Sequence, residues 1–230
     1  MPGERVRRIV VSESNARATA ALGCICLTFD LRGHEQTRGQ FDTVSREDNL
    51  RDVLAAYDVL AGQRGVDPTA IAVVGSSYGG YLAAILSSLR PVRALALRAP
   101  ALYKDTDWTM AKRLLRKQQE LDRYRLRTVR PGDSRALLAC TMFEGDVLIV
   151  ESEHDDVVPR QVIENYRGAC GRARSVTYRV LQGADHGLST DPLQRAYTRL
   201  LVDWLAETVI GVAFAPGVDD QARIMAQPHA

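Results

Sequence analysis

Ser77 lies at the centre of a short motif whose residue types and spacing favour nucleophilic chemistry. Residues 75–79 read G-S-S-Y-G, which fits G-x-S-x-G, with a short apolar run before the motif and a helical pattern after it. In that context the pattern is typical of a sharp strand-to-helix turn that exposes the serine hydroxyl. Gly75 and Gly79 lack side chains, so the strand and the helix can approach each other closely. The serine would also lie at the N-terminus of the helix, which stabilises developing negative charge. We therefore predict that Ser77 is a nucleophile.

A serine hydroxyl is a poor nucleophile unless an imidazole accepts its proton and a carboxylate fixes the imidazole tautomer. The chain has only four histidines, His34, His154, His186 and His229. His186 follows the last predicted strand on a short turn, where its side chain can swing back over the strand ends. It also comes after the acidic candidates in chain order. We therefore predict that His186 is the base.

Two adjacent carboxylates compete to orient His186. Asp155 and Asp156 both follow a predicted strand at 147–150. Only one of them can point toward His186, and the residue types alone do not decide which. Asp185 is adjacent to His186 in the chain and cannot easily reach its ring from the required side.

Composition limits the class of protein. The chain has 230 residues, enough for one well-buried domain or at most two small ones. Hydrophobic residues make up 46% and charged residues 25%, the ordinary balance of a globular protein. The net charge of +2 gives no overall indication of a nucleic-acid or membrane partner.

The cysteines and the N-terminus predict a cytoplasmic setting. The four cysteines form no C-x-x-C pair, and no histidine stands at zinc-ligand spacing, so we expect reduced thiols and no metal. The N-terminus lacks the apolar core of a signal peptide. No uninterrupted apolar run approaches the length of a membrane span.

The first third of the chain alternates strand and helix patterns. Strands are predicted at 6–11, 24–29 and 71–74, and helices at 12–22 and 45–61. The continuous apolar run at 24–29 favours a strand buried on both faces, whereas 62–68 reads as a loop. Residues 45–48 resemble a capping box. The alternation predicts a parallel sheet with helices on both faces, an α/β fold.

The remainder continues this alternation with one interruption. Further strands are predicted at 94–99, 146–152 and 175–181, and further helices at 159–168 and 191–209. The long, basic segment 103–144 has helical stretches at 107–126 and 133–142. It predicts either a small helical insertion over the active site or a solvated crossover that does not contact substrate. Residues 210–230 are expected to form a loose tail.

Several motifs together resemble the α/β-hydrolase superfamily, most closely its dienelactone-hydrolase-like and acyl-peptidase-like esterases. They are the serine motif, F-D-L-R-G-H at 29–34, H-D-D-V-V-P at 154–159 and G-A-D-H at 183–186. The likeness covers about residues 20–209. In this pattern the acid stands four residues before the proline that opens the next helix, which implies Asp155 and leaves Asp156 as a surface or helix-start carboxylate. The resemblance implies a serine hydrolase that acts through an acyl-enzyme, without a cofactor. A serine at residue 77 argues against haloalkane dehalogenases, which have an aspartate there.

The front of the chain departs from that pattern. In these hydrolases one oxyanion donor is the N–H of the residue after the nucleophile, here Tyr78. The second comes from a His-Gly-type loop after an earlier strand, and this chain has no His-Gly there, so the second donor is unassigned. Residues 6–11 are the only candidate for that strand, which implies either a short form of the family or a start upstream of Met1. An unpaired apolar edge on the strand at 24–29 would then favour self-association.

These observations lead to three functional hypotheses. The first is a serine hydrolase of carboxylic esters or related acyl bonds, with Ser77, His186 and Asp155 as triad and a small-molecule acyl or ester substrate. The second is a peptidase or amidase of the same fold. The third is an interaction module whose catalysis is impaired by an incomplete oxyanion hole. In each case, residues 1–209 form the α/β-hydrolase domain, with residues 103–144 as its cap.

Overall fold

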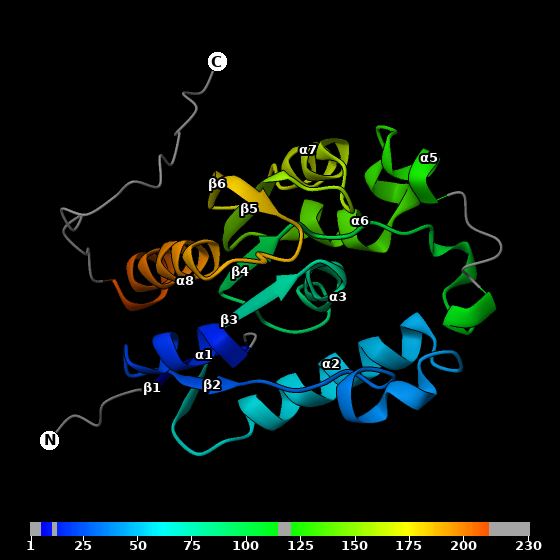
Figure 1. The fold of residues 1–230 in the computed structure, drawn as a ribbon. Helices are drawn as coiled ribbons and strands as arrows, with labels where there is room; N and C mark the ends of the chain where they lie inside the picture. Colours follow the sequence, from blue (N-terminus) through cyan, green and yellow to red (C-terminus); the bar gives the residue numbers. More distant parts are fainter. Residues whose placement is uncertain (1–5, 11–12, 115–120, 212–230) are drawn as a thin grey trace, which may run out of the picture.

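A parallel six-stranded sheet forms the centre of the molecule in the computed structural model (Figure 1), which describes residues 6–10, 13–114 and 121–211. All five strand pairings are parallel, in the order β2-β1-β3-β4-β5-β6. The strands are β1 (Val6–Val10), β2 (Ile25–Leu27), β3 (Val66–Ser76), β4 (Ala94–Arg98), β5 (Asp146–His154) and β6 (Ser175–Asp185). Since parallel strands have their carboxyl ends at the same edge of a sheet, the residues that follow these strands lie close together at that edge.

Helices cover both faces of the sheet. The α-helices are α1 (Glu13–Ala20), α2 (Arg46–Ala61), α3 (Tyr78–Leu86), α5 (Leu121–Arg125), α6 (Arg135–Met142), α7 (Arg160–Ala169) and α8 (Asp191–Leu205). Short 3₁₀ turns lie at η1 (Glu35–Gln40), η2 (Asp105–Asp107) and η3 (Pro131–Asp133), and a π-turn, η4 (Ala206–Ile210), continues α8. The predicted α/β architecture is confirmed.

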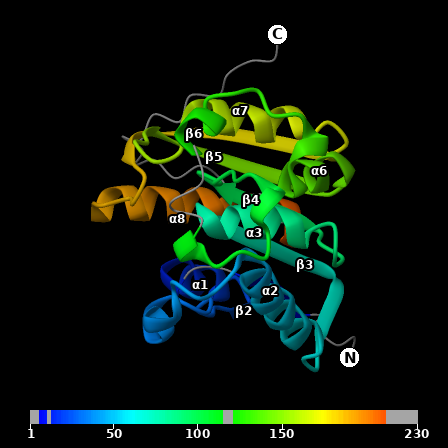
Figure 2. The same ribbon diagram turned by 90° about the vertical axis from the view of Figure 1, so that its right-hand side faces the viewer.

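The buried apolar residues form two layers, one on each side of the sheet. One layer joins the sheet to α2, α3, α6 and α7. The other joins it to α8, with Ala16 of α1 packed against it. Figures 1 and 2 show α1 and α8 on one side of the sheet and α2, α3, α6 and α7 on the opposite side.

The predicted capping box at the start of α2 is present. The Ser45 hydroxyl accepts from the Asp48 N–H at 3.1 Å, while the Asp48 carboxylate accepts from the Ser45 N–H at 3.0 Å. This exchange satisfies backbone donors that the first turn of a helix leaves unpaired. The box fixes where α2 begins, and therefore where Arg46, its first residue, is held.

The predictions for two strands need correction. The segment predicted at 24–29 as a strand buried on both faces is a three-residue edge strand, β2, whose Ile25 is 39% exposed. Among the strands that the structure describes, β2 pairs with β1 alone, so its other edge has no described neighbour. Strand β3 begins at Val66, within the predicted loop at 62–68, because Val66 already pairs with Val6 before a register shift.

Strand β1 occupies the place between β2 and β3. The strand predicted at 6–11 is therefore present, and it forms part of the sheet. The Ser77 strand, β3, is thereby paired on both sides, with β1 and β4.

The segment predicted as an insertion has two parts. At its C-terminal end, α6 buries Ala136, Leu137 and Cys140 and belongs to the core layer with α3 and α7. At its N-terminal end, an antiparallel bridge joins Ala111 to Ser45. Residues 115–120 of the predicted helix 107–126, and 212–230 of the predicted tail, lie outside the described residues.

Candidate active site

Ser77 occupies a strained turn between β3 and α3. Its backbone has φ 52° and ψ −119°, a positive φ that a non-glycine residue adopts only when its surroundings enforce it. The Ser77 N–H donates to the Arg98 carbonyl at 2.9 Å, which attaches the turn to the neighbouring strand. A Cβ on Gly75 would overlap the Gly79 backbone and lie 2.7 Å from Gly80 Cα, so residue 75 must be glycine. A Cβ on Gly79 would meet nothing within 4 Å, so only the first glycine of the motif is sterically required.

The side chains of Ser77, His186 and Asp155 form a continuous chain of hydrogen bonds. His186 Nε2 lies 2.9 Å from Ser77 Oγ, and His186 Nδ1 lies 2.9 and 2.8 Å from the two Asp155 oxygens. A carboxylate beside Nδ1 favours the tautomer with its proton on that nitrogen, so the Nε2 lone pair faces the hydroxyl. The three residues follow the ends of β3, β5 and β6 and meet at one edge of the sheet. The arrangement can transfer a proton from Ser77 Oγ to His186 Nε2.

The loop after β5 distinguishes the neighbouring carboxylates. Asp155 Oδ1 accepts from the N–H groups of Val157 and Val158 at 2.9 and 2.8 Å, and its side chain is only 6% exposed. Asp156 is exposed. Asp185 accepts instead from the Ser189 N–H at 2.9 Å, within its own turn. The structure therefore brings Asp155, of the three candidates, to His186.

The other histidines lie elsewhere. His154 is exposed, and its ring lies 3.8 Å from the Glu153 carboxylate. His34 stacks on the Tyr78 ring with 6.3 Å between ring centroids, so it lies beside the residue that follows Ser77. His229 is outside the described ranges.

Tyr78 is the first residue of α3, and its N–H therefore has no acceptor within the helix. This N–H is available to a developing negative charge next to Ser77. The tyrosine hydroxyl donates to Asn49 Oδ1 of α2 at 3.1 Å, which fixes the ring away from the helix axis. Residues 11 and 12, part of the loop that would supply a second donor, are not among the residues described.

Arg98 was missed in the sequence and connects both sides of the Ser77–His186 pair. Its carbonyl accepts from Ser77, as above, and its Nη1 donates to the His186 carbonyl at 2.9 Å. The residue is 8% exposed and its guanidinium lies 5.8 Å from the Tyr197 ring centroid. In the sequence, Arg98 could have been noticed as the one charged residue at the end of an otherwise apolar predicted strand, A-L-A-L-R at 94–98.

Lys112, from the predicted insertion, lies against the same region. Its ammonium is 3.2 Å from His34 Nε2 and 4.5 Å from the centroid of the Tyr78 ring. Burial lowers the Lys112 pKa from 10.5 to about 8, and Asp52 opposes this shift. At least this part of the segment 103–144 therefore contacts a residue adjacent to Ser77.

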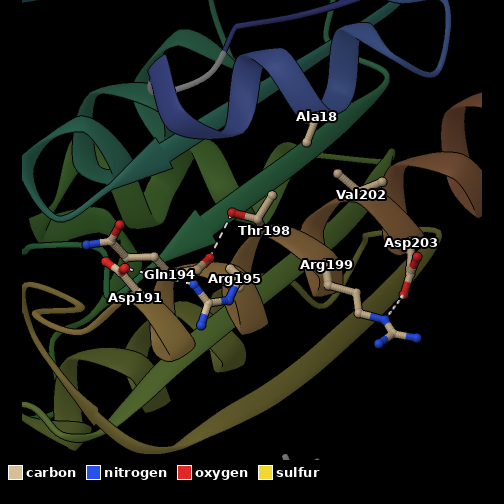
Figure 3. A pocket seen from close by; sticks show the side chains of 8 residues that line it. All are labelled: Ala18, Asp191, Gln194, Arg195, Thr198, Arg199, Val202 and Asp203. Atoms are coloured by element: carbon tan, nitrogen blue, oxygen red, sulfur yellow. Dashed lines mark hydrogen bonds and ion pairs between the residues drawn. The ribbon is translucent and has the colours of Figure 1, made fainter. Parts of the chain in front are cut away.

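A hollow of about 430 Å³ lies between α1 and α8, away from Ser77 (Figure 3). Figure 3 shows its charged groups coming from α8, where Asp191 and Arg195 lie 3.9 Å apart and Arg199 and Asp203 lie 4.0 Å apart. Their charges are thus balanced within one helix, and the described residues that line the hollow include no histidine or cysteine.

Within the described ranges, no group of three or more His, Cys, Asp or Glu side chains is arranged to hold a metal ion. Among the helices that the structure describes, none has both the length and the apolar character needed to cross a bilayer.

Comparison with known sequences identifies the family. A sequence profile of the prolyl oligopeptidase family, Peptidase_S9, matches residues 10–211. The uncharacterised protein Rv2307c of Mycobacterium tuberculosis is 31% identical over 179 residues, which are 74% of this chain and 56% of that protein. The chain thus spans little more than half the length of this curated relative.

Solved structures share the fold at low sequence identity. A metagenome-derived lipolytic enzyme, from a study of LipS and LipT, superposes with a TM-score of 0.67 at 17% identity, covering 89% of this chain and 95% of that one. The acylaminoacyl peptidase of Pyrococcus horikoshii gives 0.66 at 16% identity, covering 95% of this chain and 39% of the peptidase. The chain therefore has the α/β-hydrolase fold and belongs to the prolyl oligopeptidase family.

Proposed function

We propose that this chain is a serine hydrolase that cleaves a carboxylic ester or a related acyl bond through an acyl-enzyme. The observation that carries the proposal is the hydrogen-bonded chain Ser77–His186–Asp155, at 2.9 Å and 2.8 Å. Ser77 supplies the nucleophilic hydroxyl, His186 supplies the base that takes its proton, and Asp155 supplies the carboxylate that orients the base. Membership of a serine-peptidase family supports the same reaction type.

In the first half-reaction, Ser77 Oγ attacks the acyl carbon while His186 Nε2 takes its proton. The Asp155 carboxylate stabilises the resulting imidazolium, and the Tyr78 N–H donates to the oxyanion. Collapse of the tetrahedral intermediate breaks the bond to the leaving group, which receives the proton from His186. In the second half-reaction, water gives a proton to His186 Nε2 and attacks the acyl carbon. Collapse of this intermediate breaks the bond between the acyl carbon and Ser77 Oγ, which takes the proton from His186 as the acid leaves. The proposed reaction uses no cofactor.

The completeness of the oxyanion hole sets the expected rate. Removal of one donor from such a hole lowers turnover by about 10²–10³. A chain in which the Tyr78 N–H acts alone is therefore expected to be a slow enzyme that still forms an acyl-enzyme. Residues near Tyr78 from the segment 103–144, such as Lys112, would act as a cap that limits which acyl groups enter.

A peptidase or amidase is the second candidate, because the family is described by its oligopeptidases and an acylaminoacyl peptidase shares the fold. Matched ester and anilide substrates with one acyl group separate the two. We expect the ratio of ester to anilide hydrolysis rates to be larger with the enzyme than in the uncatalysed reaction. The reverse preference would assign the chain to the peptidases.

The experiment that tests the proposed mechanism compares the two neighbouring acids. Asp155→Asn should lower ester turnover by about 10⁴, the scale seen when a triad acid no longer sets the tautomer. Asp156→Asn should leave turnover nearly unchanged, since that side chain is exposed. Equal losses in both variants, or a loss only with Asp156→Asn, would reject the assignment.

We place the activity in the cytoplasm, which agrees with the four free thiols.

A further inference from the structure

Arg46 is a buried cation whose guanidinium forms no hydrogen bond within the described chain. The residue is 1% exposed, and none of Nε, Nη1 and Nη2 has a hydrogen-bond partner within the described chain. A guanidinium does not lose its proton in proteins, so it cannot escape burial by becoming neutral. A buried charge is unfavourable by several kcal/mol unless a counter-charge and hydrogen bonds compensate it. A bound anion would supply both the counter-charge and the hydrogen-bond acceptors.

Aromatic rings surround this guanidinium. Its Cζ lies 5.6 Å from the Tyr103 ring centroid and 6.0 Å from that of Trp108. The hydroxyl of Tyr124 is also buried without a hydrogen-bond partner. The Tyr103 and Tyr124 rings both pack against the core cluster that contains Trp108. Two buried polar groups in this region, the Arg46 guanidinium and the Tyr124 hydroxyl, are thus without a hydrogen-bond partner within the described chain.

Further cations lie on the same rings. Arg125 lies 5.1 Å from the Tyr103 centroid, Arg135 lies 4.8 Å from that of Trp108, and the Lys104 ammonium lies 5.9 Å from that of Tyr124. We call Arg46, Tyr103, Trp108 and Tyr124 the Arg46 enclosure. Three cations therefore lie against the rings of this enclosure, in addition to Arg46 itself.

The carboxylate of Asp105, two residues after Tyr103, already has hydrogen-bond partners. Asp105 accepts from the Tyr81 hydroxyl at 2.8 Å with one oxygen and from the Arg135 N–H with the other. No carboxylate of the described residues forms an ion pair with Arg46. The counter-ion is thus not supplied by this part of the chain.

The Arg46 enclosure adjoins the proposed nucleophile. The Tyr103 ring packs edge-on against the Tyr78 ring with 5.7 Å between centroids, and Tyr78 directly follows Ser77. Two residues before Tyr103, the Ala101 N–H donates to the Ser77 carbonyl at 2.9 Å. Tyr103 and Tyr124 are only partly buried, whereas Arg46 is 1% exposed.

We propose that Arg46 binds a carboxylate at the far end of the substrate's acyl group, so that the enzyme prefers half-esters of dicarboxylic acids. The inference rests on the proposed attack by Ser77. The planar guanidinium suits a carboxylate because its N–H groups can donate in parallel to both oxygens. The aromatic walls contact the methylene chain that joins the carboxylate to the ester, and the Tyr124 hydroxyl supplies a further donor.

Two esters of equal chain length test the preference. Mono-4-nitrophenyl adipate and 4-nitrophenyl hexanoate differ in a terminal carboxylate. In Arg46→Met the ratio of kcat/KM for adipate over hexanoate should fall at least about tenfold, the scale of a hydrogen-bonded charge pair. Arg46→Lys, which keeps the charge and loses the planar fork, should give an intermediate ratio. Arg51→Met, which removes an exposed arginine of the same helix, should keep the wild-type ratio. An unchanged ratio in both Arg46 variants would overturn the proposal.

A binding measurement separates this proposal from the proposed reaction. Free adipate should raise the melting temperature of Ser77→Ala, which cannot turn over, and should not raise that of Ser77→Ala with Arg46→Met. We expect the Arg46→Met chain to remain folded, because it removes an uncompensated buried charge. If the wild type hydrolyses neither ester but adipate still raises the melting temperature of Ser77→Ala alone, the proposed reaction is rejected and the binding site is supported. The same shift in both variants, or no shift in either, would reject the site.

Discussion

At the scale of single residues, Arg98 performs two tasks from one position. Its backbone carbonyl fixes the Ser77 turn, and its guanidinium holds the turn that carries His186. A charge-assisted hydrogen bond of this kind contributes more than a neutral one, and its loss leaves a buried carbonyl without that donor. Arg98 touches neither substrate nor reacting atoms in the proposed reaction, so we describe it as a positioning residue.

We expect Arg98→Met to lower kcat by about 10–100-fold, because His186 is no longer held at hydrogen-bond distance from Ser77. Active-site titration should give the turnover per labelled serine, so that loss of folded protein is not counted. Arg98→Lys should recover part of the rate. Arg90→Met removes an arginine paired with Asp58 on the surface and serves as the control. A normal rate per active site in Arg98→Met would exclude the positioning role.

Lys112 makes the stability of the chain depend on pH. Its pKa is about 8 in the folded chain against an ordinary 10.5. Between those values the unfolded chain binds a proton that the folded chain does not, so this group stabilises the fold progressively as the pH rises through that window. Below pH 8 both states are protonated, and the unfavourable burial of the ammonium is fully present.

Lys112→Met should therefore raise the free energy of unfolding at pH 7, and its advantage over the wild type should shrink as the pH rises from 8 to 10.5. Urea denaturation of both proteins at several pH values measures this difference. Arg113→Met, a change at the exposed neighbouring residue, should show no such trend, because arginine does not titrate in this range. A constant difference across the window would contradict the shifted pKa.

At the scale of elements, the turn between β3 and α3 depends on one glycine. Gly75→Ala should abolish folding or ester turnover, because the added Cβ overlaps the Gly79 backbone. Gly79→Ala should leave the fold intact and raise its free energy of unfolding by up to about 1 kcal/mol, since alanine favours helix over glycine. Melting temperatures of the two variants measure the contrast. Equal tolerance of both would show that the approach of β3 and α3 is looser than described.

Local patterns explain which elements could be predicted. The capping box at Ser45, the helix after Pro159 and the apolar strands at 94–99 and 146–152 each depend on neighbours in sequence, and each was found. The positions of Ser77 and His186 after predicted strands led to the prediction that they meet at one edge of the sheet, whereas the choice of Asp155 over Asp156 came from the resemblance to the hydrolase pattern. Arg46 and Arg98 could not be recognised, because their importance comes from partners far away in the chain. Arg46 in particular resembles a solvated residue of a first helical turn.

At the scale of the whole molecule, the sheet has an open edge at β2. Among the described strands, β2 pairs only with β1, and its Ile25 is 39% exposed. An unpaired edge offers backbone groups to a second chain. We predict that the 230-residue chain self-associates and that Ile25→Lys shifts it toward the monomer in analytical ultracentrifugation. A wild-type chain that is monomeric at high concentration would refute this prediction.

The central claim is that Ser77, and no other serine, is the nucleophile. A fluorophosphonate probe that reacts with activated serines tests it directly. The probe should label the wild type and Ser76→Ala, since the Ser76 hydroxyl is buried without a partner, and should fail to label Ser77→Ala. Peptide mapping should locate the phosphonyl group on Ser77. Equal labelling of all three proteins, or a modified residue other than Ser77, would contradict the account.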